Sequence, residues 1–166
     1  PAKDCIPMPE DVPLEEGCII ADAISTPYHA VRNRGRVRAG DTVAVFGCGG
    51  LGMNVVQCAV ASGATVIAVD VNDAKLGTAR FLGASALITP RSAGRVDKEI
   101  KKLTNGGVDV AFECIGKPQT LGQGYTATIE RSTLDYGMKD DPEDQIVAVN
   151  PAVQVLINGP KGEERR

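Results

Sequence analysis

Residues 42–52 read TVAVFGCGGLG, an apolar run that breaks into closely spaced glycines. Its first five residues form an apolar, β-branched run that is too short for a typical helix and too continuous to be exposed on one face, so it predicts a buried strand of a parallel sheet. The run ends in Gly47, Gly49 and Gly52, spaced G-x-G-x-x-G. Apolar residues at helical intervals then predict a helix over 51–61. A strand, a glycine turn and a helix in this order are typical of a dinucleotide-binding βαβ unit.

Strand and helix patterns alternate along the chain after this turn. Strands are predicted over 42–46, 65–69, 86–89 and 108–114. Helices are predicted over 51–61, 73–82, 95–104 and 118–131. Four alternations joined by short turns predict an α/β fold with a doubly wound parallel sheet, the Rossmann fold, and with right-handed crossovers.

The N-terminal part has a different character. Residues 1–13 contain four prolines and predict a linker or entry segment. Helical spacing of apolar residues predicts a helix over 14–23, and Pro27 is expected to begin a second short helix that ends at Gly35. We therefore expect the Rossmann domain to span 14–158, followed by a polar tail over 159–166.

Two assignments of the fifth strand are open. Residues 132–137, STLDYG, would place Asp135 inside a strand covered on both faces, which costs about 2 kcal/mol or more when the carboxylate has no partner. The other choice is 146–149, after an acidic turn, with 153–157 as the edge strand. We favour the second assignment.

The roles of the three glycines follow from what a side chain would obstruct. Gly47 allows the tight turn, Gly49 lets the backbone approach a pyrophosphate, and Gly52 lets the helix pack close to the strand. Asp70 ends the second strand 18 residues after Gly52, where a carboxylate can accept both ribose hydroxyls of NAD and repel the 2′-phosphate of NADP. Lys75 either reaches the adenosine ribose or is a solvated helix lysine. The structural alternative is a doubly wound domain that has kept the tight turns without binding a nucleotide.

Composition excludes several classes of function. The 166 residues carry a net charge of −3 with scattered Lys and Arg, so neither nucleic acid nor a membrane is an expected partner. Five widely spaced cysteines without a C-x-x-C pair predict neither a disulfide framework nor a structural zinc site, which favours a cytoplasmic protein. His29 is the single histidine, so the chain holds no site built on two histidines.

The chain resembles the coenzyme domain of zinc-dependent alcohol dehydrogenases, in the medium-chain dehydrogenase/reductase family. The matching stretches are PLEE (13–16), DAISTPYHA (22–30), GDTVAVFGCGGLG (40–52), VIAVD (66–70), LGA (82–84) and GVDVAFECIG (107–116). The resemblance extends over residues 7–118. It implies an oxidoreductase that transfers a hydride between NAD and an alcohol or carbonyl substrate, with a zinc ion polarising the substrate oxygen.

The resemblance also implies roles for particular residues. Thr26 would lie near the nicotinamide, and Ile115 along the coenzyme. The residues expected at the pyrophosphate and the adenosine ribose are Gly49, Gly50, Leu51, Asp70 and Lys75. Asp22 would be one zinc ligand, with the other ligands supplied by a catalytic domain that this chain lacks.

Two consequences follow for function. No catalytic residue is assigned within the chain, because a catalytic zinc needs about three protein ligands. Zinc is expected only where a catalytic domain is supplied. The surface that packs on such a domain would be exposed here, and self-association into a homo-oligomer is expected to cover it. The alternative function is a non-catalytic Rossmann module with a structural or interaction role.

Overall fold

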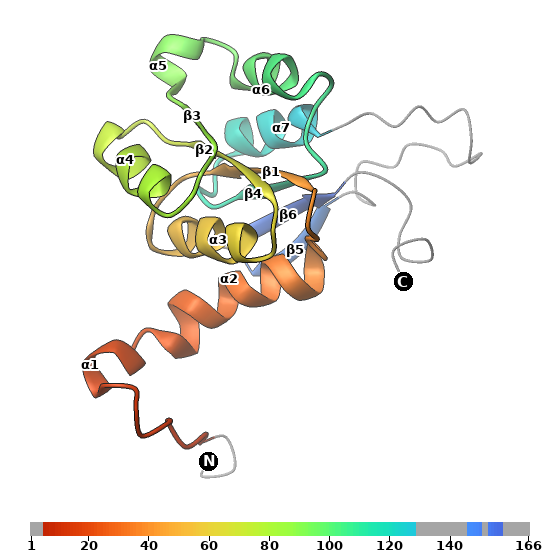
Figure 1. The fold of residues 1–166 in the computed structure, drawn as a ribbon. Coiled ribbons are helices and arrows are strands. Elements are labelled where there is room, and N and C mark those ends of the chain that lie inside the picture. The colour runs from red at the N-terminus through yellow and green to blue at the C-terminus, as the bar shows by residue number, and fades with distance from the viewer. Residues whose placement is uncertain (1–4, 129–145, 151–152, 158–166) are drawn as a thin grey trace, which may run out of the picture.

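The computed structural model describes residues 5–128, 146–150 and 153–157. Within these ranges six strands form one sheet in the order β3-β2-β1-β4-β6-β5 (Figure 1). The strands are β1 (Thr42–Phe46), β2 (Thr65–Val69), β3 (Ala86–Ile88), β4 (Val110–Glu113), β5 (Ile146–Asn150) and β6 (Val153–Ile157). β1 pairs in parallel with β2 on one side and with β4 on the other, and β2 pairs in parallel with β3. The predicted parallel sheet of a Rossmann-like fold is therefore confirmed for these four strands.

The last two strands are arranged differently from the prediction. β5 confirms a strand at 146–149, but the assignment of 153–157 to the sheet edge is wrong, because β6 lies between β4 and β5. β6 runs antiparallel to both neighbours. Only two residues separate β5 from β6, and such a link permits an antiparallel hairpin, whereas a parallel crossover needs a dozen or more residues. The alternative strand at 132–137 lies outside the described residues.

Helices cover the sheet and precede it. They are α1 (Leu14–Gly17), η2 (Ile20–Ile24), α2 (Ser25–His29), η3 (Ala30–Arg34), α3 (Gly50–Ala61), α4 (Asp73–Phe81), α5 (Pro90–Ala93), α6 (Val96–Thr104) and α7 (Pro118–Ala127). α3, α4 and α6 begin and end within one residue of the predicted bounds. α5, a single turn that begins at a proline, was not predicted, and α7 stops short of the predicted end at residue 131.

The N-terminal helices differ from the prediction in their boundaries. The expected helix over 14–23 is divided, because α1 ends at Gly17, and Pro27 lies inside a helical stretch that runs from η2 to η3 rather than at the start of a new helix. Proline lacks the N–H that an α-helix interior uses. The turns on either side form i→i−5 hydrogen bonds, from the amide of Ile24 to Ile19 O (3.2 Å) and from that of Gly35 to Ala30 O (2.7 Å).

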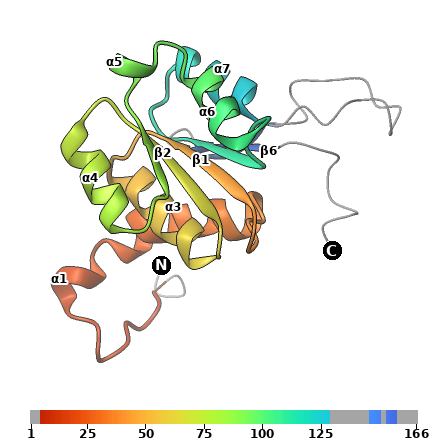
Figure 2. The ribbon, with the colours of Figure 1, turned by 45° about the horizontal axis from the view of Figure 1, so that its top comes forward.

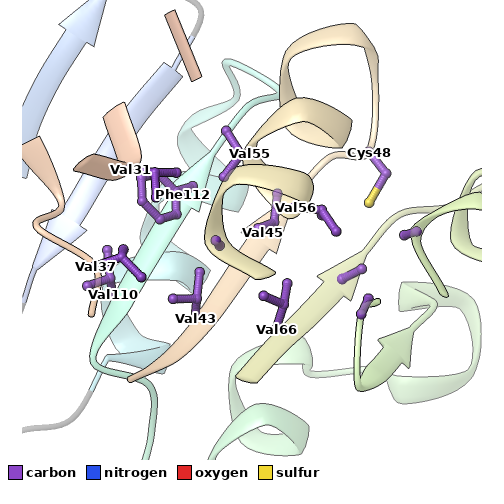
Figure 3. Packing of buried hydrophobic residues seen from close by; sticks show 14 of the residues in the cluster. Val31, Val37, Val43, Val45, Cys48, Val55, Val56, Val66, Val110 and Phe112 are labelled. Atoms are coloured by element: carbon purple, nitrogen blue, oxygen red, sulfur yellow. The ribbon is translucent and has the colours of Figure 1, made fainter. Parts of the chain in front are cut away.

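The two faces of the sheet carry separate hydrophobic clusters. Side chains of β1 alternate, so that Val43 and Val45 face the cluster built with α3, α4 and η3, while Ala44 and Phe46 face the cluster built with α6 and α7. Figure 2 shows these helices on opposite sides of the strands. Figure 3 shows the first cluster, with α3 lying over the valines of β1. Burial of both faces explains why these strands read as continuous apolar runs.

Among the described residues, no helix has the length and apolar character needed to cross a lipid bilayer.

Candidate functional site

The glycine turn joins β1 to α3 and brings two backbone segments into close contact. Gly47 has a φ of +90°, a conformation that side chains with a Cβ rarely adopt, and a Cβ built there would lie 2.6 Å from Cγ1 of Ile115. A Cβ on Gly52 would overlap the carbonyl oxygen of Gly47 and lie 2.9 Å from its carbonyl carbon. The tight turn and the close approach of helix to strand that the glycine spacing predicts are both present.

The other two glycines of the turn face open space. A Cβ on Gly49 or Gly50 would meet no atom within 4 Å. Gly49 is the N-cap residue of α3 and Gly50 its first residue; the first amides of the helix have no acceptor within it and carry the positive end of its dipole. Both glycines line a pocket of about 370 Å³ together with Leu51, Gly52, Cys114, Ile115 and Gly116. A concave site with free amides at a helix N-terminus suits an anionic group.

Asp70 lies at the end of β2, beside the glycine turn, and is only 8% exposed. Its Oδ2 accepts a hydrogen bond from the amide of Cys48 (2.7 Å), and its Oδ1 accepts one from the amide of Asn72 (2.9 Å). The carboxylate therefore fixes the turn after β1 as well as the turn after β2. A carboxylate oxygen can accept more than one hydrogen bond, so both oxygens of Asp70 retain capacity for a ligand hydroxyl.

Lys75 is exposed in the first turn of α4. That helix is capped by Asn72, whose side-chain oxygen accepts hydrogen bonds from the amides of Ala74 (2.9 Å) and Lys75 (3.3 Å). Burial and the nearby Asp70 carboxylate raise the pKa of the Cys48 thiol to about 11, and the Lys75 ammonium opposes this rise.

The opposite wall of the pocket is held by a residue that sequence reasoning missed. Glu113, the last residue of β4, is 1% exposed. Its carboxylate accepts hydrogen bonds from the amides of Ile115 (2.9 Å) and Gly116 (2.9 Å) and from the hydroxyl of Thr120 (2.8 Å). Ile115, predicted to lie along the coenzyme, is 42% exposed and lines the pocket. An acid inside an apolar strand was the signal that could have revealed Glu113.

Thr26 and Asp22 lie in the N-terminal helical stretch and do not line this pocket. The hydroxyl of Thr26 donates a hydrogen bond to Oδ1 of Asp22 (3.1 Å), so the two residues form a pair. In the described part of the chain, no group of three or more His, Cys, Asp or Glu side chains could hold a metal ion. The residues present therefore fit an anionic cofactor but do not by themselves fit a catalytic zinc.

Comparison with known proteins decides the family. The sequence model of a family described as zinc-binding dehydrogenase matches residues 50–148. The chain belongs to this zinc-binding dehydrogenase family. This confirms the resemblance drawn from the glycine turn and the stretches around it.

Three similar proteins illustrate the relationship. Alcohol dehydrogenase class-2 isozyme 2 of Oryctolagus cuniculus is 38% identical over 130 residues, 77% of this chain and 33% of that protein. The structure of an alcohol dehydrogenase zinc-binding domain protein from Burkholderia ambifaria matches 73% of this chain and 33% of its own, with 39% identity and a TM-score of 0.70. The structure of 2R,3R-butanediol dehydrogenase from Bacillus subtilis matches 74% of this chain and 35% of its own, with 37% identity and a TM-score of 0.66. The chain spans about a third of the length of these relatives.

Proposed function

We propose that this chain binds NAD in the pocket between the glycine turn and residues 114–116, as the nucleotide-binding part of an alcohol-dehydrogenase-like oxidoreductase. The observation that carries the proposal is that the glycines of the turn have two different surroundings, one closely packed and one open. Gly47 and Gly52 make the turn compact, whereas Gly49 and Gly50 leave open space at the N-terminus of a 12-residue helix. A turn kept only for packing has no need of open glycines at a helix start.

Each residue of the site has a physical role in this proposal. The amides of Gly50 and Leu51, at the positive end of α3, would bind the pyrophosphate. The Asp70 carboxylate would accept the ribose hydroxyls and disfavour the 2′-phosphate of NADP through like-charge repulsion. Lys75 would contact the same ribose from the first turn of α4.

The chemistry of the whole protein is part of the proposal. NAD, when bound, supplies the acceptor or donor of a hydride. Thr26 would lie near the nicotinamide, and Asp22 would contribute one zinc ligand beside others from a catalytic domain. The named relatives support a small alcohol or carbonyl compound as substrate. This chain contributes binding and orientation of the cofactor.

Location and assembly also belong to the proposal. All five cysteines are free thiols, which supports a cytoplasmic location. Ile19, Ile20 and Tyr28 expose apolar surface on the N-terminal helical stretch, which supports burial of this face against a catalytic domain or in a homo-oligomer. Light scattering of the purified chain tests the second possibility, for which a monomeric mass counts against self-association.

Calorimetric titration with NAD and with NADP tests the cofactor assignment. The wild-type chain should bind NAD at least about tenfold more tightly than NADP. Asp70→Ala should bring the ratio of the two affinities close to one. Asp73→Ala, which removes an exposed acid from the first turn of α4, should leave the ratio unchanged. The ratio of the two affinities is the informative quantity. Asp70→Ala also removes the acceptor of the Cys48 amide, and this loss would weaken the binding of both cofactors equally.

Two results would contradict this assignment. NADP binding as tight as NAD binding would show that Asp70 does not select the cofactor. No binding of either, together with no rise in melting temperature at millimolar NAD, would favour a non-catalytic Rossmann module, because a ligand of the folded state must stabilise it.

A further inference from the structure

Glu113 is a buried carboxylate to which the proposed roles assign no contact with a ligand. It pairs with Phe46 in the parallel register of β4 and β1, directly before the glycine turn begins. It lies on the face of the sheet covered by α6 and α7, since Ala111, two residues earlier on the strand, belongs to that cluster. An ionised carboxylate in such a place is strongly destabilising unless hydrogen-bond donors surround it.

The donors around Glu113 come from the segment that follows it. Oε2 accepts from the amide of Gly116 (2.9 Å), and Oε1 accepts from the amide of Ile115 (2.9 Å). The Thr120 hydroxyl, in the first turn of α7, lies 2.8 Å from Oε1 and 3.0 Å from the carbonyl oxygen of Lys117. The carboxylate thus joins the end of β4, the loop after it and the start of α7.

That loop forms one wall of the pocket and packs on the other wall. Cys114, Ile115 and Gly116 are three of the seven lining residues. The Ile115 side chain occupies the space beside Gly47, where a Cβ would lie 2.6 Å from Cγ1. A shift of the loop backbone would therefore change both the width of the pocket and the packing of the glycine turn.

We infer that Glu113 is a positioning residue for the cofactor pocket: it contacts no ligand itself and holds residues 114–116 at the separation from α3 that the pyrophosphate requires. This inference rests on the proposed NAD-binding function. Glu113 acts on the turn after β4 as Asp70 acts on the turn after β1, through carboxylate oxygens that bind loop amides.

Glu113→Gln tests the inference with little change in side-chain volume. Glutamine keeps one oxygen and places an N–H₂ group where Oε2 was, so the amide of Gly116 loses its acceptor at 2.9 Å. It keeps only the longer contact of 3.2 Å to Oε1, which already accepts from Ile115 and Thr120. The Kd for NAD should rise roughly tenfold. Amide hydrogen exchange of Ile115 and Gly116 should accelerate at least about tenfold, with exchange in β1 unchanged.

Three further variants separate positioning from general destabilisation. Thr120→Val should weaken NAD binding by a smaller factor, and Thr120→Ser, which keeps the hydroxyl, should restore wild-type affinity. Asp97→Asn is the matched control: Asp97 is also buried, but it is bonded to Arg95 and does not line the pocket. This variant should lower the melting temperature without changing the Kd for NAD.

The outcomes distinguish the two proposals. If the wild-type chain binds NAD and Glu113→Gln binds it equally well, or if exchange at Ile115 and Gly116 is unchanged, the positioning role is wrong and the NAD-binding function stands. If the wild-type chain does not bind NAD, the proposed function fails, and the inference fails with it.

Discussion

Replacement of Gly52 by alanine should destabilise the fold strongly. The added Cβ would overlap the carbonyl oxygen of Gly47 and lie 2.9 Å from its carbonyl carbon and 3.4 Å from Cβ of Cys114. The obstructing atoms belong to the backbone of the turn, so no side-chain rotation relieves the contact, and α3 has to move away from β1. Overpacking of a buried site costs typically 1–3 kcal/mol, and a contact against rigid backbone belongs at the upper end, at about 3 kcal/mol.

For a chain of this size, about 3 kcal/mol corresponds to a fall in melting temperature of roughly 6–12 °C. Thermal unfolding followed by far-ultraviolet circular dichroism measures it. Gly50→Ala is the matched control, because Gly50 begins the same helix and a Cβ there meets no atom within 4 Å; its stability should stay equal or rise by up to about 1 kcal/mol. A melting temperature of Gly52→Ala within about 2 °C of wild type would refute the argument from close packing.

Three further predictions follow from other parts of the structure. Gly77→Ala, at an exposed position of α4 where a Cβ meets no atom within 4 Å, should raise the free energy of unfolding by about 1 kcal/mol in urea titrations; unchanged stability would count against this. The Arg95 guanidinium lowers the pKa of Asp97, so the stability gained from this pair is complete above the unfolded pKa of about 4 and is lost as the pH falls through the lower folded value. Asp97→Asn should therefore flatten the decline of stability below pH 4, and an equally steep decline would exclude the pair as its source. Iodoacetamide should label the exposed Cys5 before Cys114, because burial and the Glu113 carboxylate raise the pKa of Cys114. NAD should slow the labelling of Cys114. Equal labelling rates for the two thiols would contradict the placement of Cys114 in the pocket wall.

Much of the fold was predictable because short-range patterns coincide with the forces that stabilise it. Strands buried on both faces read as apolar runs, and the turn glycines stand where the backbone needs them. Asparagine is a favoured residue directly before a helix, and the side-chain oxygen of Asn72 caps α4 through two hydrogen bonds. These features depend on residues close together in the chain.

The errors concern pairings that local patterns do not determine. The two-residue link makes β5 and β6 an antiparallel hairpin, but it does not determine which of the two strands pairs with β4; that pairing joins residues far apart in the chain, and the strand pattern alone did not reveal it. Pro27 was expected to start a helix, yet turns with i→i−5 hydrogen bonds on both sides accommodate it inside one. Each feature depends on backbone geometry rather than on residue type.

In the site too, features set by residue spacing were predictable, whereas contacts made through the fold were not. The glycines and the acid at the end of β2 were found from their spacing, but the second bond of Asp70, to the Cys48 amide, joins residues 22 positions apart. The partners of Glu113 lie two to seven residues further along the chain, and the rule that a buried acid needs donors was applied to Asp135 and not to Glu113. Applied to every acid in an apolar strand, that rule would have revealed it.

We propose that NAD occupies the pocket formed by the start of α3 and the loop after β4. Two-dimensional amide NMR of the chain during titration with NAD tests it most directly. The largest shift changes should occur at residues 49–52 and 114–116, with smaller changes at Asp70 and Asn72. No shift changes at saturating NAD, or changes confined to residues outside this pocket, would contradict it.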